Sequence, residues 1–137
     1  MIKDKIILIA EDDADDRLLI KEAFEENQTS AMIIFFENGE ELLNYLKDFS
    51  KEEAAILPDL FILDLNMPKT NGKEVLKYLK EQNIFREIPV IILTTSKSKE
   101  EENNVLSMGA AGFFTKPSSF TELVDLTASI HRNWILN

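Results

Sequence analysis

Four short apolar runs of this chain each end in polar side chains that could do chemistry together. They are Ile6 to Ala10 followed by Glu11-Asp12, Leu60 to Leu63 followed by Asp64, Val90 to Leu93 followed by Thr94, and Gly112 to Thr115 followed by Lys116. An acidic pair, a carboxylate, a hydroxyl and an ammonium in one place could bind a divalent cation and transfer a phosphoryl group to the single carboxylate. That carboxylate is Asp64.

Short runs of β-branched and aromatic residues are typical of buried parallel strands. The sequence predicts strands at Lys5 to Ala10, Met32 to Phe36, Asp59 to Asp64, Pro89 to Thr94 and Gly112 to Thr115. Caps and apolar stripes predict helices over about Ala14 to Glu26, from Asn38-Gly39 through Leu46, from Gly72 through Leu79, from the capping box Ser98–Glu101 to near Gly109, and from the capping box Ser119–Glu122 almost to Asn137. A connector from Phe49 to Pro58 is longer than most in this kind of fold.

Alternating strands and helices imply right-handed crossovers and a parallel sheet covered on both faces. We therefore predict a single α/β domain over residues 1–137, doubly wound and flavodoxin-like, with five parallel strands in the order 2-1-3-4-5. Ligands of such sheets bind outside the carboxyl ends of the strands. The four polar groups that follow the apolar runs lie at the ends of the four strands that this order places side by side. The second strand ends in Phe36-Glu37, which offers no comparable group.

Composition narrows the class of protein. The chain has 137 residues, of which 45% are hydrophobic and 29% charged, and it has no cysteine, so disulfides, thiolate metal sites and cysteine catalysis are excluded. Its net charge is −10 and no run of Lys or Arg could neutralise phosphates, which argues against direct nucleic-acid binding. Because no apolar stretch is long enough to cross a bilayer and the N-terminus has no signal-peptide pattern, we expect a cytoplasmic protein with no membrane contact.

The acidic run from Glu11 to Asp16 has two parts. Asp13, Asp15 and Asp16 are expected to be a solvated helix start, where carboxylates complement the helix dipole. Glu11 and Asp12 differ because they directly follow a buried strand. An EF-hand is excluded because the run lacks the glycine and the terminal glutamate of that loop. Carboxylates with a carbonyl and waters suit Mg²⁺ or Mn²⁺.

Taken singly, each of these polar residues has an ordinary structural explanation. Asp64 could cap a loop, Thr94 could satisfy its hydroxyl on backbone, and Lys116 could be a surface ammonium. Together, Glu11-Asp12, Leu63-Asp64-Leu65-Asn66-Met67-Pro68, Thr94 and Lys116-Pro117 resemble the receiver domain of bacterial two-component response regulators, with the spacing from Thr94 to Lys116 of the chemotaxis regulator. Gly72 and the Gly112-Phe113 pair match the same family, and the resemblance covers the whole chain.

The resemblance implies a role for each of these site residues. Asp64 would receive a phosphoryl group from a histidine kinase, with Asp12 and Asp64 binding the cation directly, Glu11 through water and Asn66 by its backbone carbonyl. Lys116 would pair first with Asp64 and then with a phosphoryl oxygen. Thr94 would move to donate to another oxygen, and Phe113 would be the aromatic switch behind it, unless it is plain core. The Lys116–Pro117 bond would be cis.

We expect a stand-alone receiver without an output domain, which catalyses only its own phosphorylation and dephosphorylation. Its partners would be a sensor histidine kinase or phosphotransfer protein, and either a protein target or a second copy. The 49–58 connector, the loop from Pro68 to Gly72 and the last helix with Trp134 look like regulators paired with bacterial phytochromes. The expected output face is the fourth helix, fifth strand and last helix, with more apolar side chains than one core stripe absorbs: Val105, Leu106, Met108, Leu126, Ile130 and Trp134.

Three alternative functions fit the sequence less well. A pseudo-receiver that acts without phosphorylation would lose the acid pair, Asp64 or Lys116, and none is lost. A flavin carrier of the same topology needs a Gly- and hydroxyl-rich loop after the first strand, where Glu11-Asp12-Asp13 would repel phosphate. A haloacid-dehalogenase-like phosphatase needs a second aspartate two residues after the first, where Asn66 stands. His131, the only histidine, is expected on a helix surface remote from the site.

Overall fold

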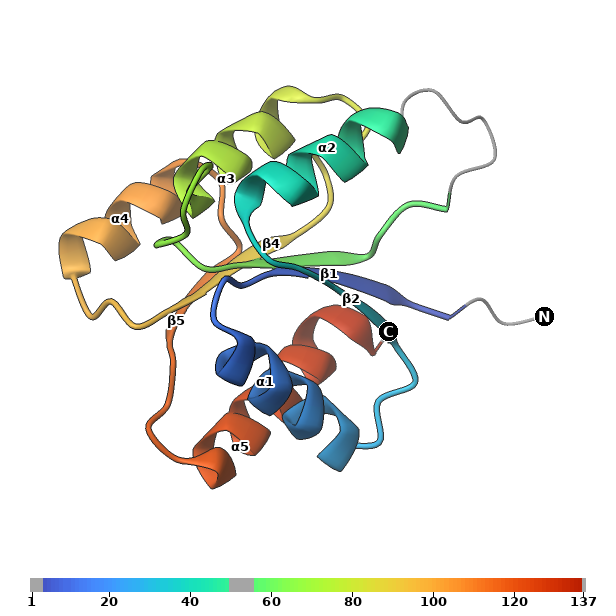
Figure 1. The fold of residues 1–137 in the computed structure, drawn as a ribbon, viewed down its shortest axis with the longest axis vertical. Helices are drawn as coiled ribbons and strands as arrows, with labels where there is room; N and C mark the ends of the chain where they lie inside the picture. The colour runs from blue at the N-terminus through green and yellow to red at the C-terminus, as the bar shows by residue number, and fades with distance from the viewer. Residues whose placement is uncertain (1–3, 50–55, 137) are drawn as a thin grey trace.

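A computed structural model describes residues 4–49 and 56–136, in which strands and helices alternate along the chain (Figure 1). The elements are β1 (Ile6–Ala10), α1 (Ala14–Glu26), β2 (Met32–Phe36), α2 (Gly39–Phe49), β3 (Leu60–Leu63), α3 (Gly72–Glu81), β4 (Val90–Thr94), α4 (Lys99–Ser107), β5 (Gly112–Thr115), α5 (Phe120–Ile130) and the π-helix η1 (His131–Ile135). Residues 50–55 of the expected connector lie outside the described residues. None of the helices in the described ranges is both long and apolar enough to cross a membrane.

The five strands form one parallel sheet in the order β2-β1-β3-β4-β5, as predicted. Every connection between consecutive strands passes through a helix, which parallel pairing requires. Helices α2, α3 and α4 cover one face of the sheet, and α1 and α5 cover the other (Figure 1). The predicted doubly wound, flavodoxin-like fold is therefore confirmed.

Each face of the sheet has its own apolar core, because successive strand side chains point to opposite faces. Leu8, Phe61 and Ile92 are buried in the core under α2, α3 and α4, whereas Ile7 and Ile62 are buried under α1 and α5. The three central strands β1, β3 and β4 are buried on both faces, as near-continuous apolar runs indicate. These two cores fix the strand ends at which the polar residues of the predicted site lie.

Side-chain caps begin the helices close to the predicted positions. Ser98 and Ser119 each accept a hydrogen bond from the backbone N–H three residues on. Both predicted capping boxes are only half formed, because the Glu101 carboxylate accepts from the Ser96 hydroxyl and the Glu122 carboxylate accepts from the Ser119 hydroxyl. A complete capping box that we did not predict joins Asn71 and Glu74 at the start of α3.

One expectation for the C-terminal part is wrong. No cis peptide bond occurs in the described ranges, so the Lys116–Pro117 bond is trans. Proline lowers the preference for trans to only about 0.5–1 kcal/mol, so it permits cis without requiring it. The last helix does run almost to Asn137, as predicted, although α5 passes into a π-helical turn over His131–Ile135.

The expected apolar surplus on α4 and α5 is also mostly absent. Val105 and Ile130 are fully buried, and Leu126 and Trp134 are half-buried against the core under α1 and α5. The Trp134 ring meets the edge of Phe114 with their centroids 6.1 Å apart. Of the six side chains proposed for that surface, only Leu106 is exposed. The reason is that α5 packs on α1 and so needs a wider apolar stripe than a helix that covers the sheet alone.

Candidate functional site

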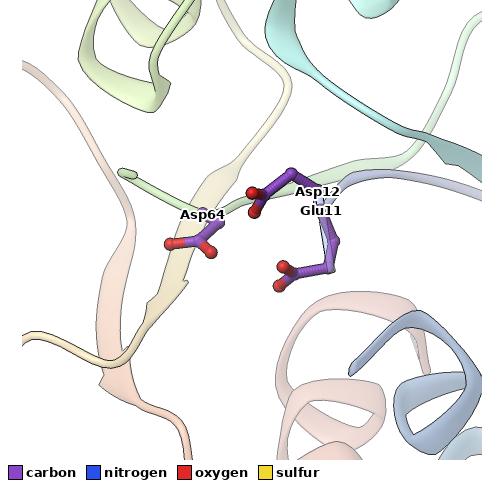
Figure 2. Close-up of side chains that lie close together, drawn as sticks. All are labelled: Glu11, Asp12 and Asp64. Atoms are coloured by element: carbon purple, nitrogen blue, oxygen red, sulfur yellow. The ribbon is translucent and has the colours of Figure 1, made fainter. Parts of the chain in front are cut away.

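Three carboxylates meet at the carboxyl ends of β1 and β3. One oxygen each of Glu11, Asp12 and Asp64 lies within 4.8 Å of the other two, and Figure 2 shows the three side chains gathered over the strand ends. Glu11 and Asp64 are buried, at 2% and 6% exposed, whereas Asp12 is open to solvent. The site therefore has a closed floor of two carboxylates and one accessible acid at its rim.

The pairing of β1 with β3 explains why these acids meet. Ala10 pairs with Leu63, so the next residue on each strand, Glu11 and Asp64, must also be neighbours. The Asp64 N–H donates to the Ala10 carbonyl at 3.1 Å, and the Glu11 N–H donates to the Phe36 carbonyl at 3.0 Å. These hydrogen bonds hold both acids at the sheet edge despite the repulsion between their charges.

A single ammonium balances the acids. Lys116 Nζ lies 2.6 Å from Glu11 Oε1, 2.8 Å from Asp16 Oδ2 and 3.1 Å from Asp64 Oδ2. Its backbone N–H donates to the Thr94 carbonyl at 2.7 Å, which fixes the position of Lys116 just beyond β5. The structure therefore brings Lys116 to Asp64 as the sequence predicted, and adds two carboxylate partners.

Asp16 is a site neighbour that the sequence did not reveal. It was expected to be solvated at the start of α1, yet its carboxylate contacts Lys116 while its side chain remains 34% exposed. Asp16 is the last residue of the acidic run and lies in the first turn of α1, which the Lys116 contact therefore places beside the site. A signal existed in the run itself, because Asp16 lies on the same helix face as Ile20 and Ala23, which are buried.

Arg17 is a second residue that the sequence analysis missed. Its guanidinium donates to the Glu11 carbonyl at 2.8 Å and lies 3.4 Å from Glu37 Oε1. It thereby ties α1 to the end of β1 and to the residue that follows β2. No local pattern distinguishes such an arginine from an ordinary one on a helix surface.

Burial controls the charge state of Glu11. Loss of hydration raises its pKa from 4.5 to about 7, the Lys116 hydrogen bond opposes this rise, and the nearby Asp64 charge adds to it. For Lys116, burial alone would lower the pKa. The hydrogen bonds to Asp16 and Glu11 and the charge of Asp64 outweigh burial and raise the pKa of the ammonium above its usual value. Lys116 is therefore positively charged at any physiological pH.

Thr94 and Phe113 lie where the resemblance places a switch. Thr94 is fully buried at the end of β4, and its hydroxyl accepts from the Ser96 N–H at 3.5 Å. Phe113 is half-buried against the core under α4. The Ser96 carbonyl accepts from the Thr115 hydroxyl at 2.9 Å, and the Ser96 hydroxyl donates to Glu101 of α4. Hydrogen bonds thus connect the end of β4 with both β5 and α4.

The loop after β3 closes the site from the α3 side. The Asn66 N–H donates to Asp64 Oδ1 at 3.3 Å, and the Gly72 N–H donates to the Leu65 carbonyl at 3.1 Å. A Cβ on Gly72 would lie only 2.3 Å from the Asp64 carbonyl oxygen. Only glycine therefore lets the start of α3 approach the backbone of Asp64 so closely. His131 lies at the end of α5, away from these strand ends.

The donor set suits a hard divalent cation. Glu11, Asp12 and Asp64 supply only oxygen atoms, and the described residues place no histidine or sulfur among them. Oxygen ligands with room for water are what Mg²⁺ and Mn²⁺ prefer. Because Asp12 is exposed, a cation could reach the site from solvent and retain waters.

Comparisons with known proteins agree with this geometry. The response regulator receiver domain family matches residues 7–128. The probable methanogenesis regulatory protein FilR2 of Methanothrix harundinacea is 34% identical over 95% of this chain and 83% of its own length. The response regulator Rcp1 of Synechocystis is 28% identical over 96% of this chain and 89% of its own length.

Solved structures give the same result. The phosphorylated cyanobacterial phytochrome response regulator RcpA superposes with a TM-score of 0.87 at 29% identity, covering 97% of this chain and 95% of its own. The Mn²⁺-bound form of Rcp1 superposes with a TM-score of 0.84 at 28% identity, covering 96% and 94%. With a family match over most of its length and the predicted fold and sheet order, the chain belongs to the response regulator receiver domain family.

Proposed function

We propose that this protein is a phosphorylated response regulator, which accepts a phosphoryl group on Asp64 from a sensor histidine kinase or a phosphotransfer protein. The observation that carries the proposal is the buried Asp64 carboxylate, which shares the Lys116 ammonium with Glu11 beside an open acid, Asp12. A buried carboxylate with a fixed cation beside it is a suitable nucleophile for phosphoryl transfer, since most of the catalysis there is positioning and charge stabilisation.

In the transfer, one carboxylate oxygen of Asp64 forms a bond to phosphorus and becomes an acyl phosphate. The bond between phosphorus and the donor atom breaks, and its electron pair stays on the imidazole nitrogen of the kinase histidine, or on the acetate oxygen of acetyl phosphate. The Lys116 ammonium stabilises the negative charge on the transferred group. The chemistry of the protein would be limited to this step and to hydrolysis of the acyl phosphate.

Glu11, Asp12 and Asp64 would hold Mg²⁺ or Mn²⁺, and the backbone carbonyl of Asn66 is the further ligand that the family resemblance implies. When bound, the cation supplies positive charge that offsets the clustered carboxylates and the incoming phosphoryl group. Glu11 already uses Oε1 on Lys116 and Oε2 on the Asp13 N–H. We therefore propose that Glu11 acts on the cation through water and Asp12 directly. The solved Mn²⁺-bound form of Rcp1 supports a cation in this fold.

The signal would leave through α4, β5 and α5 by changed protein contacts. Thr94 lies beneath this face, and movement of its hydroxyl toward a phosphoryl oxygen would release the Ser96 N–H that it now accepts from. Because Ser96 also contacts Glu101 and Thr115, that movement would reach α4 and β5 together. Phe113, half-buried under α4, would follow by packing alone, since it has no hydroxyl.

Similarity to RcpA, Rcp1 and a bacteriophytochrome response regulator supports a phytochrome-type kinase as the partner. The proposed protein is a cytoplasmic receiver that signals to a protein target or a second copy of itself without contacting nucleic acid. A purely structural interaction module is the competing function. It is less favoured because all the groups needed for transfer are present and in contact.

Treatment with acetyl phosphate and Mg²⁺ decides between the two functions. Phosphate-affinity gels and intact mass should show one added phosphoryl group on the wild type and none on Asp64→Asn. Omission of Mg²⁺ should prevent the modification. Equal modification of the wild type and Asp64→Asn would reject Asp64 as the acceptor, and no modification of either would favour the interaction module.

A further inference from the structure

The described carboxylates include one, Asp16, that contacts Lys116 but has no part in the proposed chemistry. We propose that Asp16 is a positioning residue that holds the Lys116 ammonium in the resting state and competes with the phosphoryl group for it. The charge on Asp16 would then slow the phosphorylation of Asp64. This inference rests on the proposed function.

The Lys116 ammonium has no spare donor for a phosphoryl oxygen. An ammonium has three N–H groups, and Lys116 Nζ has three carboxylate partners at 2.6, 2.8 and 3.1 Å. Asp64 is the most distant of the three. Every N–H donor of the Lys116 ammonium is therefore engaged. A phosphoryl oxygen can accept a hydrogen bond from it only if one carboxylate loses its own.

One of the three carboxylates must release the Lys116 ammonium. Glu11 is 2% exposed, so loss of the Lys116 ammonium would leave a buried carboxylate without its nearest counter-charge, at high cost. Asp64 becomes part of the acyl phosphate and stays beside Lys116. The Asp16 side chain is 34% exposed and borders a small cleft lined by Leu19, Pro117 and Leu123, so water can replace the ammonium there. Asp16 is the partner that exchanges.

Hydrogen bonds at the start of α1 hold Asp16 in place. The Asp16 N–H donates to the Asp13 side chain at 2.9 Å, and the neighbouring Arg17 is bonded to the Glu11 carbonyl. These hydrogen bonds hold the first turn of α1, so Asp16 is not free to move with the ammonium when Lys116 turns to a phosphoryl oxygen. The contact must break when Lys116 turns to the phosphoryl group.

The test measures phosphorylation rate constants over a range of acetyl phosphate concentrations with saturating Mg²⁺. Asp16→Asn keeps the shape of the side chain and weakens its hold on Lys116. Asp15→Asn is the matched control, because it removes the same charge from an exposed neighbour in the same helical turn. Relative to that control, Asp16→Asn should raise the maximal rate constant about two- to fivefold, as expected for loss of a partly solvated ion pair. The acetyl phosphate concentration at half-maximal rate should not change.

A second background separates positioning from general charge effects. In Lys116→Met, which is slower overall, adding Asp16→Asn should give no further change, because the residue through which Asp16 acts is gone. The proposal is overturned if Asp16→Asn is no faster than Asp15→Asn, or if it accelerates Lys116→Met as much as the wild type.

A direct readout of the ammonium complements the kinetics. In ¹⁵N-lysine spectra of the resting protein, the Lys116 ammonium should be visible in the wild type and in Asp15→Asn, since its protons are all bonded. In Asp16→Asn it should broaden through exchange with water. An unchanged signal would overturn the proposal. A wild type that is not modified on Asp64 would instead refute the proposed function itself, so the two failures are distinguishable.

Discussion

At the scale of single residues, Glu11 carries an electrostatic cost that the rest of the site must offset. Its carboxylate is buried beside Asp64, and the ammonium that compensates it is shared among three acids. Removing a carboxylate from water favours its neutral form, which is why the pKa of Glu11 rises to about 7. An acid in this state destabilises the metal-free fold whenever it is ionised.

The pH dependence of stability should show this cost. The folded-state pKa of Glu11, about 7, is above its unfolded value of 4.5, so the native state binds more protons between these values. The free energy of unfolding should then fall as pH rises from about 4.5 to 7, by up to about 3 kcal/mol from this group.

Urea titrations in EDTA at several pH values, on wild type and Glu11→Gln, measure this effect. The neutral glutamine removes the titration, so the difference between the two proteins isolates Glu11 from the other acids. Parallel stability curves for the two proteins would contradict the prediction.

At the scale of elements, glycines set how closely α2 and α3 approach the loop after β3. A Cβ on Gly39 would lie 2.1 Å from the Thr70 carbonyl oxygen, and one on Gly72 would lie 2.3 Å from the Asp64 carbonyl oxygen. Both neighbours are backbone atoms, which cannot rotate away as a side chain can. The starts of both helices are thus packed against the segment that carries Asp64.

Gly72→Ala should therefore disturb both the fold and the site. We expect a loss of about 1–3 kcal/mol in the free energy of unfolding, as in other overpacked positions, and slower phosphorylation of Asp64. Chemical denaturation and the acetyl phosphate assay measure the two effects. Lys77→Ala, on the exposed side of the same helix, is the control and should change stability by less than about 0.5 kcal/mol. Normal stability of Gly72→Ala would mean that the loop relaxes freely.

Sequence patterns located the elements well because most of their signals are local. The apolar runs of β1, β3 and β4 differ from the observed strands by at most a residue at each end, and α1 matches its predicted bounds. The Asn71 capping box was missed because the preceding loop has no apolar pattern to mark its end. The π-helical turn at His131 and the trans bond before Pro117 depend on tertiary packing, which no short window of sequence contains.

Most of the site could also be predicted from the sequence, because the strand order fixes which strand ends are neighbours. The predicted strand order places the ends of β1, β3, β4 and β5 side by side at one edge of the sheet. The sequence alone therefore indicated that Glu11, Asp64 and Lys116 lie close together. Asp16 and Arg17 were missed, because their contacts depend on where the first turns of α1 lie relative to the strand ends, and for Asp16 only its position on the helix face of Ile20 and Ala23 hinted at this. The apolar surplus on α4 and α5 was overestimated because the packing of α5 on α1 was not anticipated.

At the scale of the whole molecule, the acid cluster should couple cation binding to stability. Glu11, Asp12 and Asp64 repel one another, and the unfolded chain does not hold them together. A cation that binds only the native state stabilises it by mass action, by about 2.7 kcal/mol at a hundredfold excess over its dissociation constant. For a chain of this length we expect Mg²⁺ to raise the melting temperature by on the order of 5–10 °C.

Asp12→Asn should abolish this rise and should melt higher than wild type in EDTA, because it removes one of the repelling charges. Calorimetry over a Mg²⁺ series on both proteins provides the test. Asp15→Asn removes an exposed charge outside the cluster and should respond to Mg²⁺ like the wild type. An unresponsive wild type would argue against the cation site.

The edge contact between Trp134 and Phe114 gives the molecule a built-in optical probe. The chain contains one tryptophan and two tyrosines. Tyr45 and Tyr78 belong to α2 and α3 on one side of the sheet, whereas Trp134 packs on the other side against the residue after Phe113. Excitation at wavelengths that only tryptophan absorbs would therefore follow one layer of the protein through β5 without any label, while tyrosine emission would follow the opposite layer.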